Sequence, residues 1–148
     1  MTKKVLIAAV SSRPFVKAAA QAGYAVTAID VFADADTQRY AEHVYKVEYA
    51  NSGFEPKHFE AVLDSLDLSQ FEGFAYGSGF EAQPDLLERI QKRLPLIGNS
   101  PAVIQKLKYA PDFFGLLTAL NIPHPEVGFE ALDDPEGWLC KEAGGSGG

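Results

Sequence analysis

Apolar runs recur along the first two thirds of the chain, and amphipathic stretches separate them. The runs at residues 4–10, 24–32, 71–76 and 94–97 predict strands, because a strand buried on both faces of a parallel sheet is apolar almost throughout. Residues 43–49 alternate between polar and apolar side chains instead, which is typical of a strand with one face toward solvent. The pattern therefore predicts a sheet made of short, mostly buried strands.

Helices are predicted in the stretches that connect these strands, at residues 14–22, 55–66 and 84–92. Pro14 suits the first turn of its helix, and Gly23 suits the position just after the last turn. Strands that alternate with helices are typical of an α/β fold. We therefore expect an open, Rossmann-like parallel sheet with helices on both faces.

The pattern changes near residue 99, so we expect two domains, at residues 1–98 and 99–148. Two helices follow in succession, at about 100–108 and 111–120. Short strands are then predicted at Val127–Phe129 and from Trp138 to Glu142. These elements are too few to close a core of their own. The second segment is therefore interpreted as the incomplete start of a further domain.

Composition narrows the range of functions. The 148 residues are 47% hydrophobic and carry a formal net charge of −7, which argues against a nucleic-acid binder because such a protein needs a basic face. The single cysteine, Cys140, permits no internal disulfide and favours a reducing, cytoplasmic setting. No apolar stretch is long enough for a membrane span. The histidines at 43, 58 and 124 are far apart and lack further ligands at metal-binding spacing, so no metal site is expected.

The loop after the first strand, Val10–Pro14, lacks the Gly-x-Gly-x-x-Gly pattern of dinucleotide-binding domains. NAD binding is therefore disfavoured. Asp30, at the end of the second strand, stands where a ribose-binding acid would lie. Without the glycines it is better interpreted as a loop or helix-capping carboxylate.

The loop Gly77–Glu81 follows a buried strand and precedes a helix. Ligands of open α/β sheets collect beyond the carboxyl ends of the strands, so Ser78, Gly79 and Glu81 are candidate substrate contacts, as is Arg13 in the first loop. In the functional interpretation Ser78 and backbone N–H groups donate hydrogen bonds, and Glu81 accepts one from an amine. The alternative is a simple glycine turn in which Glu81 favours the helix dipole.

The end of the sequence joins an apolar run to a lysine and then to glycines. Trp138, Leu139 and Cys140 lead into Lys141, and a flexible loop follows. That loop consists of Gly144, Gly145, Ser146, Gly147 and Gly148. A lysine supplies a point charge for phosphate oxygens, and glycines let backbone N–H groups approach those oxygens closely. The alternative is that the glycine run is only a flexible linker.

Taken in order, these features resemble the ATP-grasp superfamily of carboxylate–amine ligases, over the whole chain. Residues 1–98 are similar to its N-terminal pre-ATP-grasp domain. The segments Ile97–Ser100 and Leu120–Pro125 are similar to the linker of that family. Lys141 and the glycine loop after it are similar to the lid that closes over the ATP phosphates. The run at 77–81 is similar to the subgroup related to biotin carboxylase.

The resemblance implies a function and a set of contacts. Lys141 and the glycine loop are expected to bind ATP, with Lys106 or Lys108 as a further phosphate contact. The complete enzyme would use ATP and Mg²⁺ to form an amide from small-molecule carboxylate and amine substrates through an acyl phosphate. It would bind neither nucleic acid nor membrane, and a homodimer is compatible with it. The Mg²⁺ ligands of the family fall beyond this sequence, so the 148 residues are expected to be an inactive N-terminal fragment. The alternative is a stand-alone α/β module that binds a small molecule or a partner without catalysis.

Overall fold

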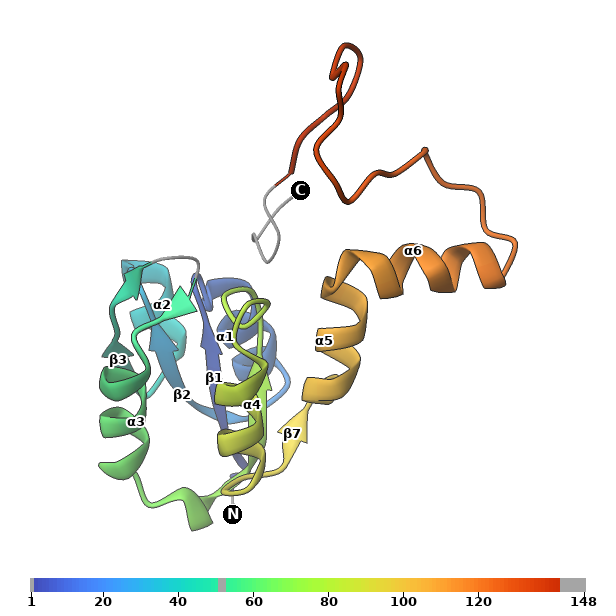
Figure 1. Ribbon diagram of the computed structural model, residues 1–148. Coiled ribbons are helices and arrows are strands. Elements are labelled where there is room, and N and C mark those ends of the chain that lie inside the picture. Colours follow the sequence, from blue (N-terminus) through green and yellow to red (C-terminus); the bar gives the residue numbers. More distant parts are fainter. Residues whose placement is uncertain (1, 51–52, 142–148) are drawn as a thin grey trace.

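The computed structural model describes residues 2–50 and 53–141, and its centre is a five-stranded parallel sheet with the order β3-β2-β1-β6-β7 (Figure 1). The sheet strands are β1 (Lys4–Ala9), β2 (Ala25–Asp30), β3 (His43–Lys46), β6 (Phe71–Tyr76) and β7 (Leu96–Ile97). The chain steps outward from β1 to β3 and then returns to the other side of β1. The order of the strands therefore reverses between β1 and β6.

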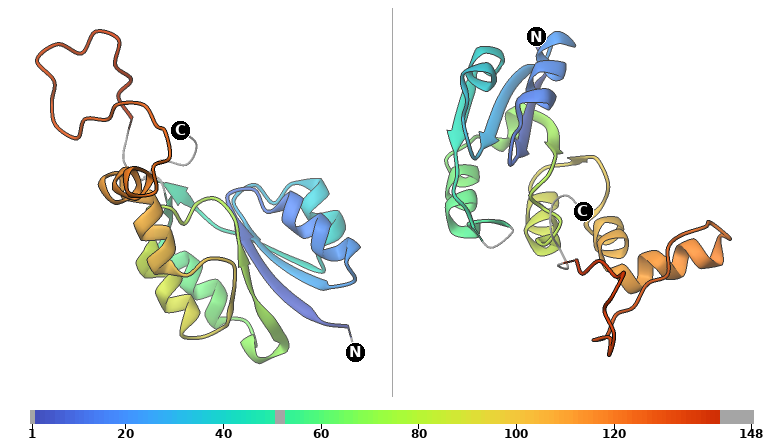
Figure 2. Two further views of the ribbon diagram at one scale, coloured as in Figure 1. Left: turned by 90° about the vertical axis from the view of Figure 1, so that its right-hand side faces the viewer. Right: turned by 90° about the horizontal axis from the view of Figure 1, so that it is seen from above.

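Helices cover both faces of this sheet (Figure 2), which confirms the predicted α/β architecture. One face carries α1 (Arg13–Gln21) and α2 (Ala35–Tyr40), and the other carries α3 (Pro56–Asp64) and α4 (Pro84–Gln91). Alternate residues of β1 separate the two cores, because Ile7 packs with Val16 of α1 whereas Leu6 packs with Phe59 of α3. The core on the α3 side is the larger and is rich in aromatic rings.

A short hairpin, β4 (Tyr49–Ala50) and β5 (Gly53–Phe54), extends the region after β3, and the 3₁₀ turn η1 (Leu68–Gln70) leads into β6. The predicted strand at 43–49 is thus divided between the main sheet and this hairpin.

After β7 the chain forms α5 (Pro101–Lys108) and α6 (Ala110–Ala119). Helix α5 lies against α4, and its half-buried Ile104 joins the larger core. Helix α6 and the segment after it extend away from the sheet (Figure 1). No residue of α6 is buried.

Two predicted strands are wrong and one helix escaped prediction. Residues 127–129 and the described part of 138–142 form no strand, because the described residues place no strand beside them to supply hydrogen bonds and an isolated strand is unstable in water. Helix α2 lacks an apolar stripe, and it begins where the Asp34 carboxylate accepts a hydrogen bond from Thr37 N–H at 2.8 Å.

Within the described residues, no helix has the length and apolar character that crossing a membrane requires. The same residues hold no group of three or more His, Cys, Asp or Glu side chains that could bind a metal ion.

Candidate functional site

The candidate site lies at the carboxyl edge of the sheet, where the strand order reverses between β1 and β6. Ligands of open α/β folds bind at such a point. The loops after the two strands are joined there, because Val10 N–H donates to the Ser78 carbonyl at 2.9 Å and Gly77 N–H donates to the Ala8 carbonyl at 2.9 Å. The sequence-predicted loops therefore form one edge of the molecule.

Asp30 fixes the first of these loops from beneath. Its side chain is fully buried and accepts hydrogen bonds from the Ser12 hydroxyl at 2.6 Å and from the Ser12 N–H. Its other carboxylate oxygen accepts from Phe32 N–H at 2.8 Å and Ala33 N–H at 2.6 Å. Ala33 has a φ of +50°, a strained conformation for a residue with a Cβ. Asp30 is therefore a loop carboxylate, as predicted, and its oxygens are occupied within the protein.

Arg13 begins α1 and remains exposed at this edge. Its guanidinium lies 3.4 Å from a carboxylate oxygen of Asp34, with about half of the Arg13 side chain accessible. The Thr37 backbone N–H, and to a lesser extent the Arg13 charge, hold the pKa of Asp34 below its ordinary value. An exposed ion pair of this kind is weak, so the guanidinium is available to an anionic group of a ligand.

The loop after β6 is shaped by two glycines that admit no side chain. A Cβ at Gly77 would lie 2.6 Å from the Phe15 ring, and one at Gly79 would lie 2.7 Å from the Phe54 ring. Gly79 also has a φ of +111°, which favours glycine. Its N–H donates to the Glu81 carboxylate at 2.6 Å. Gly79 and Glu81, two of the predicted substrate contacts, are therefore hydrogen-bonded to each other.

Ser78 is exposed at the tip of this loop. Its side chain forms no hydrogen bond with another described residue, and it remains available as a donor. The roles predicted for Ser78, Gly79 and Glu81 toward a substrate stay predictions.

Sequence reasoning missed how aromatic residues support this edge. Phe15 lies over Gly77 with 45% of its surface exposed, and Phe32 follows Asp30 with 61% exposed. Beneath them, the Gln83 side chain holds Phe54, accepting from its N–H at 2.7 Å and donating to its carbonyl at 2.8 Å. The only sequence feature that pointed to this aromatic support is the position of Phe15 in the first turn of a helix, directly after Pro14.

The predicted phosphate contacts lie outside the sheet. Lys106 and Lys108 are exposed in the last turn of α5, and Lys141 is exposed in an irregular segment. None of the three lysines forms an ion pair with another described residue, so each is available to bind an anionic group. The glycine loop, at 144–148, lies outside the described residues.

No protein-family model matches the sequence, and no curated protein matches it either. Solved structures do match its fold. The biotin carboxylase domain of a single-chain bacterial carboxylase superposes with a TM-score of 0.66 at 16% identity, covering 91% of this chain and 33% of that one. An N5-carboxyaminoimidazole ribonucleotide synthetase, PurK, solved with ADP, gives 0.60 at 15% identity, covering 82% of this chain and 30% of that one.

A third match is the biotin carboxylase domain of the Hydrogenobacter thermophilus 2-oxoglutarate carboxylase, described as a dimer in complex with MgADP, ADP and bicarbonate. Its TM-score is 0.64 at 18% identity, covering 92% of this chain and 31% of that one. The chain thus spans about a third of the length of these structures. At these identities the likeness shows the fold, and the fold is that of their N-terminal part.

Proposed function

We propose that this chain is the N-terminal part of an ATP-dependent carboxylate–amine ligase. One observation carries the proposal: the fold likeness to ATP-grasp structures covers 91% of the chain. Residues 1–98 would be the domain that faces the substrate, and residues 99–148 the start of the part that binds ATP. A homodimer is part of the same proposal, supported by the dimer described for the Hydrogenobacter domain.

The proposed reaction has two steps. A carboxylate oxygen of the substrate attacks the γ-phosphorus of ATP and ADP leaves, which gives an acyl phosphate. The nitrogen of an amine then attacks the acyl carbon, phosphate leaves, and the amine proton passes to solvent or to a base. Both steps gather negative charge on phosphoryl oxygens, and positive groups in a closed site stabilise such charge.

The described residues suit part of this task. Arg13 and Ser78 lie exposed at the switch point and would bind the substrate carboxylate or its neighbouring groups. The exposed Lys141, together with Lys106 or Lys108, would bind phosphate oxygens beside the glycine loop. Mg²⁺ would neutralise further phosphate charge, and we place its ligands outside this chain.

The test is ADP release by the complete gene product, measured with candidate acids and amines. Lys141→Ala should lower kcat/KM for ATP by roughly 100-fold, since a charged phosphate contact contributes about 1.5–3 kcal/mol. The matched control is Lys57→Ala, because Lys57 is also an exposed lysine but lies on α3; it should leave kcat/KM unchanged. Equal kinetics for wild type and both variants would remove Lys141 from the proposed site.

The 148-residue chain alone should release no ADP, because the proposed metal ligands are absent from it. Turnover above a blank that Lys141→Ala abolishes would contradict the assignment of the chain as an incomplete enzyme.

A second function, an interaction module without catalysis, has one observation in its favour. Large apolar side chains are exposed after β7, among them Leu120, Phe129 and Leu139, and exposed apolar surface commonly marks a binding face. A complete gene product that releases no ADP with any acid and amine, yet binds a protein through this face, would favour the module.

A further inference from the structure

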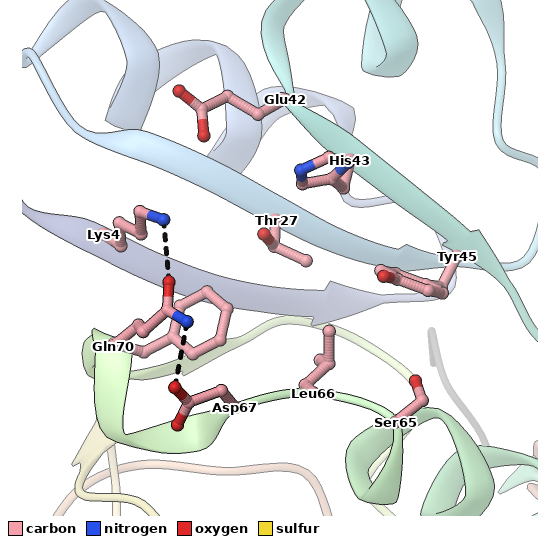
Figure 3. Close-up of a pocket in the computed structure, with 10 residues that line it drawn as sticks. Lys4, Thr27, Glu42, His43, Tyr45, Ser65, Leu66, Asp67 and Gln70 are labelled. Atoms are coloured by element: carbon pink, nitrogen blue, oxygen red, sulfur yellow. Dashed lines mark hydrogen bonds between the residues drawn. The ribbon is translucent and has the colours of Figure 1, made fainter.

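A cavity lies at the other end of the sheet, near the amino ends of the strands. It has a volume of about 180 Å³ and lies between the sheet and the segment that joins α3 to β6 (Figure 3). Lys4 and His43 are the first residues of β1 and β3, and both line it. The cavity is therefore separate from the candidate site at the carboxyl edge.

Thr27 of β2 presents an unpaired hydroxyl to this cavity. It is only 6% exposed, and its hydroxyl forms no hydrogen bond with any other described residue. Figure 3 shows its side chain among the residues that line the cavity. Thr37 Oγ1 is the one buried side-chain oxygen or nitrogen of the described residues that lacks a hydrogen bond, so the Thr27 hydroxyl opens into the cavity and can pair with a molecule there. The cavity would supply a partner for this hydroxyl if a polar molecule occupied it.

Charged groups line opposite sides of the cavity. On one side Lys4 Nζ donates to the Gln70 amide oxygen at 2.9 Å, and the Gln70 amide nitrogen donates to the Asp67 carboxylate at 3.0 Å. The Ser69 hydroxyl and Gln70 together hold the pKa of Asp67 below its ordinary value, so this carboxylate stays charged near neutral pH.

The other side carries Glu42 and His43, and the side chains of both lack partners among the described residues. His43 is the register neighbour of Thr27 on the adjacent strand. An acid, an imidazole and a hydroxyl are thus available together, with the Lys4 ammonium nearby.

We propose that this cavity binds a small zwitterionic metabolite of amino-acid size. The ligand's ammonium would pair with Glu42 on one side and its carboxylate would face Lys4 on the other, with Thr27 or His43 completing a hydrogen bond. The cavity volume of about 180 Å³ is smaller than the roughly 300 Å³ from which drug-sized pockets begin, and so suits a ligand of amino-acid size.

The experiment titrates the isotope-labelled 148-residue chain with L-serine and follows the amide resonances of Thr27, His43 and Gln70. Saturable shifts with a Kd of about 1 mM are expected, because so small a ligand offers few contacts. Acetate carries only the carboxylate of the zwitterion and methylamine only its ammonium, so each should bind at least about tenfold more weakly than L-serine. Glu42→Gln should weaken L-serine binding about tenfold, and Thr27→Val should weaken it several-fold.

Glu48→Gln is the matched control, because Glu48 is also an exposed glutamate beside β3 but does not line the cavity. It should leave L-serine binding unchanged. The proposal is overturned by the absence of saturable shifts, by acetate or methylamine binding as well as L-serine, or by equal effects of Glu42→Gln and Glu48→Gln. The spectra of the variants without ligand show that each is folded, so a loss of binding is not mistaken for unfolding.

Discussion

The parts of the chain before and after β7 differ in burial far more than in composition. In the described chain, every buried apolar residue of the two cores lies between Val5 and Leu94. After Leu96 large apolar side chains are exposed instead, including Leu120 at 58%, Phe129 at 55% and Leu139 at 78%. The second part is therefore apolar, yet apart from the contact of α5 with α4 it adds little to the core.

Helix α6 shows why hydrophobicity alone does not produce a core. Its sequence, APDFFGLLTA, is rich in apolar residues, yet it buries none of them. Helix α4 is more polar, but Leu86, Leu87 and Ile90 are buried because the sheet and α3 lie on their side. Burial thus depends on which elements the topology places opposite a helix. In the proposed ligase the face of α6 would be covered by the remainder of the enzyme.

Truncating a core aromatic residue should produce the largest change in the free energy of unfolding. It should also show the difference between the two parts most clearly. Phe59 is fully buried and its ring lies 5.3 Å from that of Phe54 and 5.7 Å from that of Phe80. Phe59→Ala should lower the free energy of unfolding by about 4 kcal/mol, because it removes apolar contacts and leaves a cavity. Urea unfolding followed by circular dichroism measures the change.

The matched variant Phe129→Ala should change the same free energy by less than about 0.5 kcal/mol, because Phe129 is mostly exposed. Similar losses for the two variants would mean that the second part has a core of its own, and the comparison would fail.

Removing the Asp30 carboxylate should have the next largest effect. Asp30→Ala leaves the buried Ser12 donors and the part-buried N–H groups of Phe32 and Ala33 without their acceptor, and we expect a loss of about 3 kcal/mol. Asp134→Ala is the control in the second part, because Asp134 also accepts a backbone hydrogen bond, from Glu136 N–H at 3.1 Å, but is exposed. Its effect should be within about 0.5 kcal/mol. A small effect at Asp30 would show that water replaces its carboxylate.

Where the sequence predicted structure well, local pattern and topology agreed. The apolar runs became β1, β2 and β6 because a parallel sheet buries both faces of its central strands. The strand predicted at Trp138 failed because its pattern was right for a strand but no partner strand lay beside it. Helix α2 was missed because a cap at Asp34, and not a stripe of apolar residues, defines it.

The candidate site was predictable only in part, for a related reason. Asp30 and the loop at 77–81 stood at the ends of recognisable strands, so their place at the carboxyl edge followed from the fold. The hydrogen bonds that occupy Asp30 and Glu81 depend on loop conformation, which the sequence pattern does not specify. Thr27 gave no signal at all, because one threonine in an apolar run is ordinary for a strand.

Adding one methyl group at a glycine should change stability in opposite directions in the two parts. Gly79→Ala should lower the free energy of unfolding by about 2 kcal/mol, because its φ of +111° is unfavourable for alanine and a Cβ there would meet Phe54. Gly115 lies within α6 with nothing within 4 Å of an added Cβ. Gly115→Ala should raise helix content and stabilise α6 by up to about 1 kcal/mol. Thermal unfolding and the helical signal in circular dichroism measure both, and a change of the same sign in both variants would contradict the comparison.

The smallest predicted effect is a difference in acid response between the two parts. The pKa values of Asp34 and Asp67 lie below the ordinary value of 3.8, so the unfolded chain binds their protons first as the pH falls. Their contribution to stability is present above about pH 4 and is lost as the pH falls through their folded-state pKa values. Asp34→Asn and Asp67→Asn should therefore flatten the fall of the urea midpoint between about pH 6 and pH 3. The only tryptophan, Trp138, lies in the second part, and its fluorescence should not follow this acid transition. Tryptophan emission that tracks the loss of the sheet, with a midpoint that Asp67→Asn shifts, would show that the two parts unfold as one unit.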